Sequence, residues 1–131
     1  MGACEIARGE KNSLELGRLD ISRDWGWAPE YVEAMWRMLQ LPEAEDFVIS
    51  TGESNTLEEF CSVTFSELGL NWRDYVTSNK SFYRPSDITY GCGESMKAEK
   101  ILGWKASIRM RDVIKKMIAH ENNKGMNNLE A

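Results

Sequence analysis

The stretch Arg23-Asp24-Trp25-Gly26 stands where the chain is predicted to change from extended segments to a helix. Residues 13–16 alternate polar and apolar side chains and end at Gly17, which predicts a short strand. Residues 21–25 are predicted to be a second extended piece that delivers Arg23. A guanidinium at the end of an extended segment can bind a carboxylate or a phosphate with two parallel hydrogen bonds. Arg23 is therefore a candidate ligand-binding residue.

Helices are predicted in four places along the chain. The first covers residues 30–40, with Pro29 in its first turn and Pro42 just beyond its end. The second begins at a capping box formed by Thr56 and Glu59. The last three helices are predicted over residues 56–68, 95–102 and 108–120.

The compact apolar run Phe-Val-Ile-Ser over residues 47–50 predicts a buried strand. Together the patterns predict the fold class α+β, a small α/β lobe with about four helices and short strands. This lobe is expected to cover residues 1–121. Residues 122–131 are polar and rich in asparagine, which predicts a disordered tail.

The composition limits the function. At 131 residues the chain is expected to form one domain. A net charge of −5 without a basic cluster argues against a nucleic-acid partner, and the absence of a long apolar run argues against a membrane partner. The three cysteines show no metal-ligand spacing, so we expect no metal and a reducing, cytoplasmic location. Cys61 lies on an apolar helical stripe and is predicted to be a core residue.

The helix predicted over residues 30–40 has an unusually wide apolar arc of roughly 200°. One neighbouring element covers a stripe only somewhat wider than 100°. We therefore expect this helix to have either two apolar neighbours or one neighbour and an exposed patch. The second arrangement predicts a homo-oligomer, most simply a symmetric dimer, through Trp25, Met35, Trp36 and Leu39.

Four segments, in order along the chain, resemble the GDP-mannose 4,6-dehydratases of the extended short-chain dehydrogenase superfamily. They are Leu16-Gly17-Arg18-Leu19-Asp20 followed by residues 23–26, then residues 45–53, then Phe82-Tyr83-Arg84-Pro85-Ser86-Asp87, and finally residues 97–105. The resemblance runs from about Leu14 to Ile118. It implies the fold of the C-terminal, substrate-binding lobe of that family.

The resemblance also implies a site for a GDP-sugar. Carried over, Arg23 and Arg84 contact the diphosphate, and Asp87 binds the nucleoside end. Leu16 and Gly17 offer backbone groups to the base. Asp87 stands where the family usually has glutamate, so its carboxylate reaches one methylene less far. Ordinary ion pairing of the two arginines with Asp24 and Asp87 is the alternative.

The complete family uses NADP, which it holds on a glycine-rich turn, and a Tyr-x-x-x-Lys pair for proton transfer. No glycine-rich turn of that kind follows a strand here, and none of the four tyrosines has a lysine four residues later. We therefore expect no cofactor site and no catalytic residue, as in a lobe without its N-terminal Rossmann partner.

Three functions fit this pattern. The chain is a catalytically incomplete dehydratase lobe that retains weak GDP-sugar binding or serves only as an oligomeric structural remnant. Alternatively, it is a GDP-sugar-binding partner or regulator. In the third case it is one subunit of a split nucleotide-sugar dehydratase or epimerase whose cofactor lobe belongs to another chain.

Overall fold

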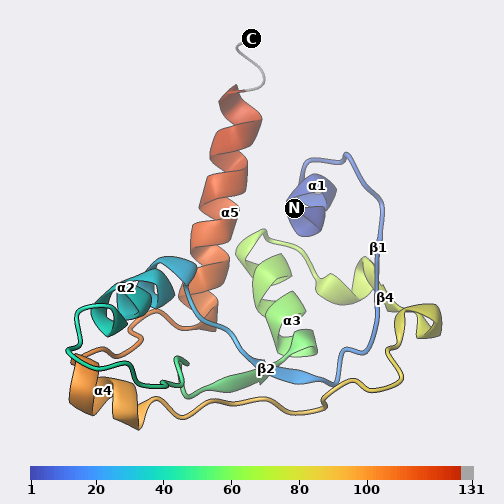
Figure 1. The fold of residues 1–131 in the computed structure, drawn as a ribbon. Helices are drawn as coiled ribbons and strands as arrows, with labels where there is room; N and C mark the ends of the chain where they lie inside the picture. The colour runs from blue at the N-terminus through green and yellow to red at the C-terminus, as the bar shows by residue number, and fades with distance from the viewer. Residues whose placement is uncertain (128–131) are drawn as a thin grey trace.

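The computed structural model describes the backbone of residues 1–127 and the side chains of residues 1–123 (Figure 1). Its α-helices are α1 (Gly2–Ala7), α2 (Ala28–Met38), α3 (Leu57–Glu67), α4 (Met96–Leu102) and α5 (Met110–Asn127). Its strands are β1 (Leu14–Leu16), β2 (Ser22–Asp24), β3 (Ser54–Thr56) and β4 (Val76–Ser78), and two 3₁₀ helices are η1 (Trp72–Asp74) and η2 (Lys80–Phe82). The small lobe with short strands is confirmed. The short helix α1 was not predicted.

The strands form two separate two-stranded sheets. β1 and β4 run parallel, with Leu14 opposite Val76. β2 and β3 run antiparallel, with Arg23 opposite Asn55, and a bridge from Ser22 to Tyr90 adds a further parallel contact. The bridge brings the segment after residue 84 beside β2, so Arg23 lies close to residues that follow it by more than sixty positions.

The first core cluster lies between α1, α3 and the β1–β4 sheet (Figure 1). Phe65 is 1% exposed and stacks on Tyr75 with ring centroids 5.9 Å apart. Ile114 of α5, also 1% exposed, packs in the same part of the molecule, where α5 lies along α3. The buried members of this cluster are Ala3, Ile6, Cys61, Phe65, Trp72 and Val76. Cys61, which the sequence predicted to be a core residue, is therefore confirmed as one.

The second core cluster joins α2 to α4 and to the chain that follows α4. Trp104 is 2% exposed, and its indole Nε1 donates to the Glu30 carbonyl over 2.8 Å. Gly103 ends α4 with a φ of 61°, a conformation that favours glycine. The buried members are Ala34, Ala98, Trp104 and Ala106. These contacts fix α2 against α4 without any sheet between them.

The capping box predicted at the start of α3 is present. The Glu59 N–H donates to Thr56 Oγ1 over 3.0 Å, and the Thr56 N–H donates to Glu59 Oε2 over 2.7 Å. Thr56 is also the last residue of β3. The cap therefore fixes the junction between β3 and α3, next to β2.

The prediction of a strand over residues 47–50 is wrong. In the described part of the chain, no backbone hydrogen bond pairs this segment with a neighbouring strand. Phe47 and Ile49 pack against the second core cluster, whereas Val48 is 55% exposed. An apolar run can become a strand only if another strand lies beside it. Within the described residues, this segment has no neighbouring strand and forms no regular element.

The last helix is longer than predicted. α5 runs from Met110 to Asn127, whereas the sequence indicated a helix over 108–120 and a disordered tail from residue 122. Residues 110, 113 and 114 are buried and anchor the start of α5, and each added residue then contributes one backbone hydrogen bond. Residues 122–127 therefore continue the helix. The remainder of the predicted tail, residues 128–131, lies outside the described residues.

The wide apolar arc of α2 corresponds to one covered side and one exposed side. Ala34 is fully buried, with Tyr31 and Met38 packed beside it in the second core cluster. Trp36 and Leu39 on the other side are 61% and 81% exposed. Of the two arrangements predicted, the exposed patch is the one found. Within the described residues, no helix is sufficiently long and apolar to cross a membrane.

Candidate functional site

A hollow of about 280 Å³ lies where the end of β1, strand β2, the start of α3 and the segment after η2 meet. Four of the five predicted site residues line it: Gly17, Arg23, Arg84 and Asp87. The lining also includes Arg18, Ile21, Trp25, Leu57 and Phe82, which had no predicted role in binding. Residues from three distant parts of the sequence therefore converge on one concave surface.

Leu16 does not line this hollow. Its side chain packs against the first core cluster, and its carbonyl accepts a hydrogen bond from the Asn79 N–H over 2.7 Å. Gly17 lies at the edge of the hollow for a steric reason. A Cβ on Gly17 would come within 3.1 Å of the Phe82 carbonyl oxygen. Glycine at position 17 therefore allows η2 to approach the end of β1 and close one side of the hollow.

Arg23 is held by three hydrogen bonds inside the molecule. Its Nη2 donates to Asp87 Oδ1 over 2.8 Å, and its Nη1 donates to the carbonyls of Ser22 and Ile88 over 2.8 and 2.6 Å. The side chains of Arg23 and Asp87 are 33% and 16% exposed. The ion pair fixes the segment around Asp87 against β2.

Asp24 faces away from Arg23 and organises a different loop. Its two carboxylate oxygens accept from the backbone N–H groups of Thr51 and Gly52, each over 2.9 Å. Gly52 has a φ of 78°, which glycine adopts without strain. The alternative expected each arginine to form an ion pair with the acid beside it. Among the described residues, Arg23 instead pairs with Asp87, and Asp24 forms no ion pair. Sequence alone gave no indication of the bonds made by Asp24.

Arg84 differs from Arg23 in having no ionic partner. Among the described residues, no carboxylate lies within ion-pair distance of its guanidinium, and the residue is exposed. Arg18, which also lines the hollow, pairs with Asp20 over 2.6 Å. Hydrogen bonding within this pair raises the pKa of Arg18 and lowers the pKa of Asp20. Arg84 is thus the arginine of the hollow that has no ion-pair partner among the described residues.

Two aromatic residues, Trp25 and Phe82, also line the hollow. Phe82 is 54% exposed. Trp25 packs on Phe60 with ring centroids 4.6 Å apart, and its Nε1 donates to the Asn55 carbonyl over 3.4 Å. A hollow lined by both guanidinium groups and aromatic rings suits a ligand that carries both an anion and a flat ring.

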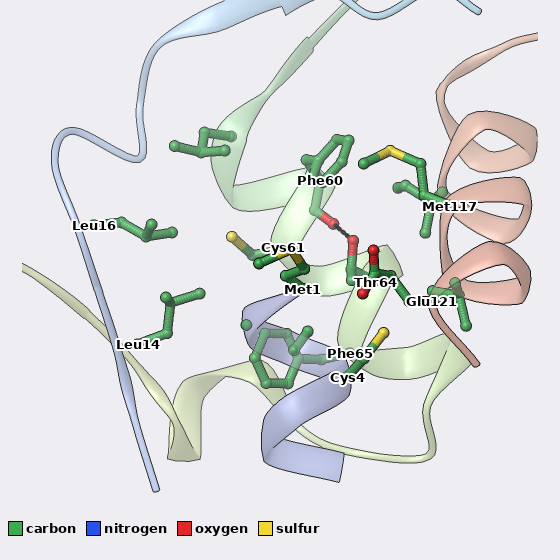
Figure 2. A pocket seen from close by; sticks show the side chains of 15 residues that line it. Met1, Cys4, Leu14, Leu16, Phe60, Cys61, Thr64, Phe65, Met117 and Glu121 are labelled. Carbon is green, nitrogen blue, oxygen red and sulfur yellow. Dashed lines mark hydrogen bonds between the residues drawn. The ribbon is translucent and has the colours of Figure 1, made fainter. Parts of the chain in front are cut away.

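A second pocket, of about 220 Å³, opens between α1, α3 and α5 (Figure 2). Its walls are mainly aliphatic, aromatic and sulfur-containing. The Thr64 hydroxyl donates to the Phe60 carbonyl over 2.7 Å, and Figure 2 marks this hydrogen bond with a dashed line. Burial raises the pKa of the Cys61 thiol to about 11, so this sulfur is a poor nucleophile at neutral pH. The chemistry of this pocket differs from that of the first hollow.

The residues described contain no unit that fits a dinucleotide cofactor. Parallel pairing in the described residues is limited to β1 with β4 and to the bridge from Ser22 to Tyr90, and neither pairing leads through a glycine-rich turn into a helix. In the same part of the chain, no three His, Cys, Asp or Glu side chains lie together as metal ligands.

The fold resembles parts of enzymes of known structure. A structure of RMD from Pseudomonas aeruginosa complexed with NADPH superposes with a TM-score of 0.77, at 18% identity, over 89% of this chain and 38% of that one. A UDP-glucose-4-epimerase from Stenotrophomonas maltophila, with bound NAD and formylated UDP-arabinopyranose, gives 0.78 at 15% identity, over 95% of this chain and 39% of that one. At these identities the likeness defines the fold alone, which is that of a part of each of these enzymes.

Sequence comparison defines the family. A model of the GDP-mannose 4,6 dehydratase family matches residues 1–117. The chain is 44% identical over 113 residues to GDP-mannose 4,6 dehydratase 2 of Arabidopsis thaliana, covering 86% of this chain and 30% of that protein. It is 35% identical over 131 residues to GDP-mannose 4,6 dehydratase of Homo sapiens, covering 87% and 35%. The chain belongs to the GDP-mannose 4,6 dehydratase family and spans about a third of the length of these relatives.

Proposed function

We propose that the hollow beside Arg23 binds the nucleotide end of a GDP-sugar and that this chain is the substrate-binding lobe of a GDP-mannose 4,6-dehydratase, without the residues for hydride transfer. The observation that carries the proposal is the convergence of Gly17, Arg23, Arg84 and Asp87 on one concave surface. Membership of the family supports the choice of ligand.

Different residues of the hollow would contact different parts of the ligand. Arg84, which has no ionic partner among the described residues, would contact the diphosphate first. Arg23 would contribute its remaining N–H groups while it stays paired with Asp87. The free oxygen of Asp87 would accept from the nucleoside, and the ring of Phe82 would offer a surface for stacking.

The chain on its own would not convert GDP-mannose. Removing and returning a hydride needs a nicotinamide held beside the sugar, and no residues within the described part build a place for it. The specific alternative is a split enzyme whose cofactor lobe is supplied by another polypeptide.

Two further proposals concern the compartment and the oligomeric state of the chain. The free thiols of Cys4, Cys61 and Cys92 fit a reducing, cytoplasmic compartment. The second proposal is that the chain associates with itself, because the exposed face of α2 is apolar and carries four large side chains.

Calorimetric titration with GDP and GDP-mannose tests the binding proposal. We expect weak binding of both, weaker binding of inorganic phosphate, and a loss of roughly tenfold or more for Arg84→Ala, since a charge-assisted hydrogen bond contributes about 1.5–3 kcal/mol. Arg73→Ala is the matched control, because Arg73 lies over the Trp72 ring and outside the hollow. Equal binding by the two variants would place the ligand elsewhere. No conversion of GDP-mannose is expected in any sample of the pure chain.

A further inference from the structure

Arg18 lines the same hollow as Arg23 and Arg84, but its guanidinium has a different environment. Its Nε and Nη2 donate to the two carboxylate oxygens of Asp20 over 2.9 and 2.6 Å. A guanidinium has five N–H donors, and these two bonds occupy only one of its edges. Among the described residues, the Arg18 side chain makes no other hydrogen bond. Nη1 and the second N–H of Nη2 therefore remain available as a pair of parallel donors.

The pair of Arg18 with Asp20 carries no net charge. Hydrogen bonding with Asp20 is the main cause that raises the pKa of Arg18, and the charge of Asp87 raises it further, so Asp87 also acts on this guanidinium. A carboxylate that is already bound to the guanidinium repels a phosphate group at the same place. The pair therefore suits a polar group without charge, whereas Arg84, with no ionic partner among the described residues, suits an anion.

The backbone just before Arg18 is fixed against η2. Gly17 approaches the Phe82 carbonyl oxygen so closely that a Cβ would lie 3.1 Å from it. The Gly17 carbonyl accepts from Ser78 Oγ over 2.8 Å, and Ser78 Oγ lies 3.0 Å from the Tyr83 hydroxyl, with which it shares a second hydrogen bond. Arg18 thus leaves the backbone next to Phe82, and both residues line the hollow.

We propose that Arg18 determines the base specificity of the hollow, because its free edge donates to O6 and N7 of a guanine that stacks on Phe82. Of the common bases, guanine presents two adjacent acceptors on this edge, whereas adenine has a donor amino group beside N7 and cytosine has a donor amino group. A bidentate arginine is the usual partner of the guanine edge. The inference rests on the proposed GDP-sugar site and adds to it the residue that selects the base.

Calorimetric titration of the chain with GDP, inosine diphosphate and ADP tests the inference. Inosine diphosphate keeps O6 and N7 of guanine, whereas ADP has an amino group in place of O6. Arg18→Ala should weaken the binding of GDP and of inosine diphosphate about fivefold or more, as for the loss of a bidentate contact to a base. It should leave the weaker binding of ADP unchanged.

Arg8→Ala is the matched control. Arg8 pairs with Glu10 through the same two nitrogens, over 2.7 and 2.8 Å, and the two residues are likewise two positions apart. Arg8 lies outside the hollow, so this variant should bind all three nucleotides like the unmodified chain. Both pairs lie at the surface, and we expect an unchanged circular dichroism spectrum for either variant.

Arg18→Lys separates the base from the phosphate as the partner of residue 18. Lysine keeps the positive charge but cannot present two donors in one plane. It should lose the preference for GDP over ADP to the same extent as Arg18→Ala. If Arg18→Ala weakens GDP and ADP equally and Arg18→Lys restores both, residue 18 binds phosphate and the inference is overturned. Equal binding of GDP and ADP by the unmodified chain would also overturn it.

Arg84→Ala shows whether a failure concerns this inference or the site as a whole. GDP binding that weakens in Arg84→Ala but is unaffected by Arg18→Ala would overturn the role of Arg18 and leave the proposed function in place. No binding of GDP by the unmodified chain would overturn the proposed function, and the inference with it.

Discussion

Arg23 and Asp87 form an ion pair of 2.8 Å between residues 64 positions apart, and the pair joins β2 to the segment that carries Arg84. Both side chains are mostly shielded from water, at 33% and 16% exposed. The carbonyls of Ser22 and Ile88 also accept hydrogen bonds from the same guanidinium. Arg23 therefore holds the site together, whereas Arg84 is free to act on a ligand.

The first prediction separates these two arginines. Arg23→Ala should lower the free energy of unfolding by about 1.5–3 kcal/mol, because it leaves a shielded carboxylate and two carbonyls without a charged donor. Arg84→Ala should change it by less than about 0.5 kcal/mol, as expected for an exposed residue without a partner. Urea unfolding followed by tryptophan fluorescence measures both. Equal losses of stability would contradict the division of roles between them.

The second prediction concerns Asp24, whose carboxylate binds the N–H groups of Thr51 and Gly52. Asp24→Ala should destabilise the protein by about 1.5–3 kcal/mol, since two backbone donors lose a charged acceptor. Asp20→Ala is the control. Its pair with Arg18 lies at the surface and should contribute no more than about 1 kcal/mol. A smaller loss for Asp24→Ala than for Asp20→Ala would show that water replaces the carboxylate in the loop.

Local patterns predicted the helices well because their signals lie within a few residues of one another. The Thr56–Glu59 capping box and the αL glycine at Gly103 are examples of such signals. The prediction of a strand over residues 47–50 failed because a strand also needs a neighbouring strand. Whether one lies beside it depends on the whole fold. α1 was missed because six residues are too few for a helical period to stand out.

The candidate site was predicted only in part. Its prediction came from the resemblance to a family and not from local sequence patterns. The resemblance identified Arg23, Arg84 and Asp87, but it did not indicate that the first and third pair with each other. Phe82 lines the hollow because η2 lies against the end of β1, which the sequence did not predict. Gly17, where a Cβ would approach the Phe82 carbonyl, was the available signal for that contact.

The third prediction is a pH dependence of stability that arises at Glu30. Partial burial acts to raise the pKa of Glu30, but hydrogen bonds from the Ser107 hydroxyl and from the Ser107 and Ile108 N–H groups outweigh it, so the pKa lies below its ordinary value of 4.5. A depressed pKa in the folded state stabilises the protein above pH 4.5. That contribution is lost as the pH falls from there through the folded-state pKa.

Glu30→Gln tests this linkage. The difference in unfolding free energy between the unmodified chain and Glu30→Gln should be largest at neutral pH and should shrink below about pH 4.5. Glu43→Gln is the control, because Glu43 is exposed and shares none of these hydrogen bonds. A difference that stays constant from neutral to acid pH would mean that the Glu30 carboxylate is not bound to Ser107 in solution.

The last prediction concerns the three thiols. Cys4 and Cys61 are 3% and 5% exposed, and burial raises the pKa of Cys61 to about 11, whereas Cys92 is exposed. The thiolate is the reactive form, and at pH 7 only roughly one Cys61 in ten thousand is ionised. A bulky, anionic disulfide reagent should therefore modify one thiol rapidly in the native protein and the other two only on unfolding.

Cys92→Ser should remove the fast reaction and leave the slow one unchanged, and measurement in urea should recover two thiols from that variant. The slow reaction should have the rate of opening of the first core cluster, because Cys61 belongs to it and Cys4 lies on the adjoining helix α1. Cys61→Ala serves to assign the slow phase. A fast reaction of Cys4 in Cys92→Ser, with the unfolding free energy unchanged, would show that α1 separates from α3 in the native state.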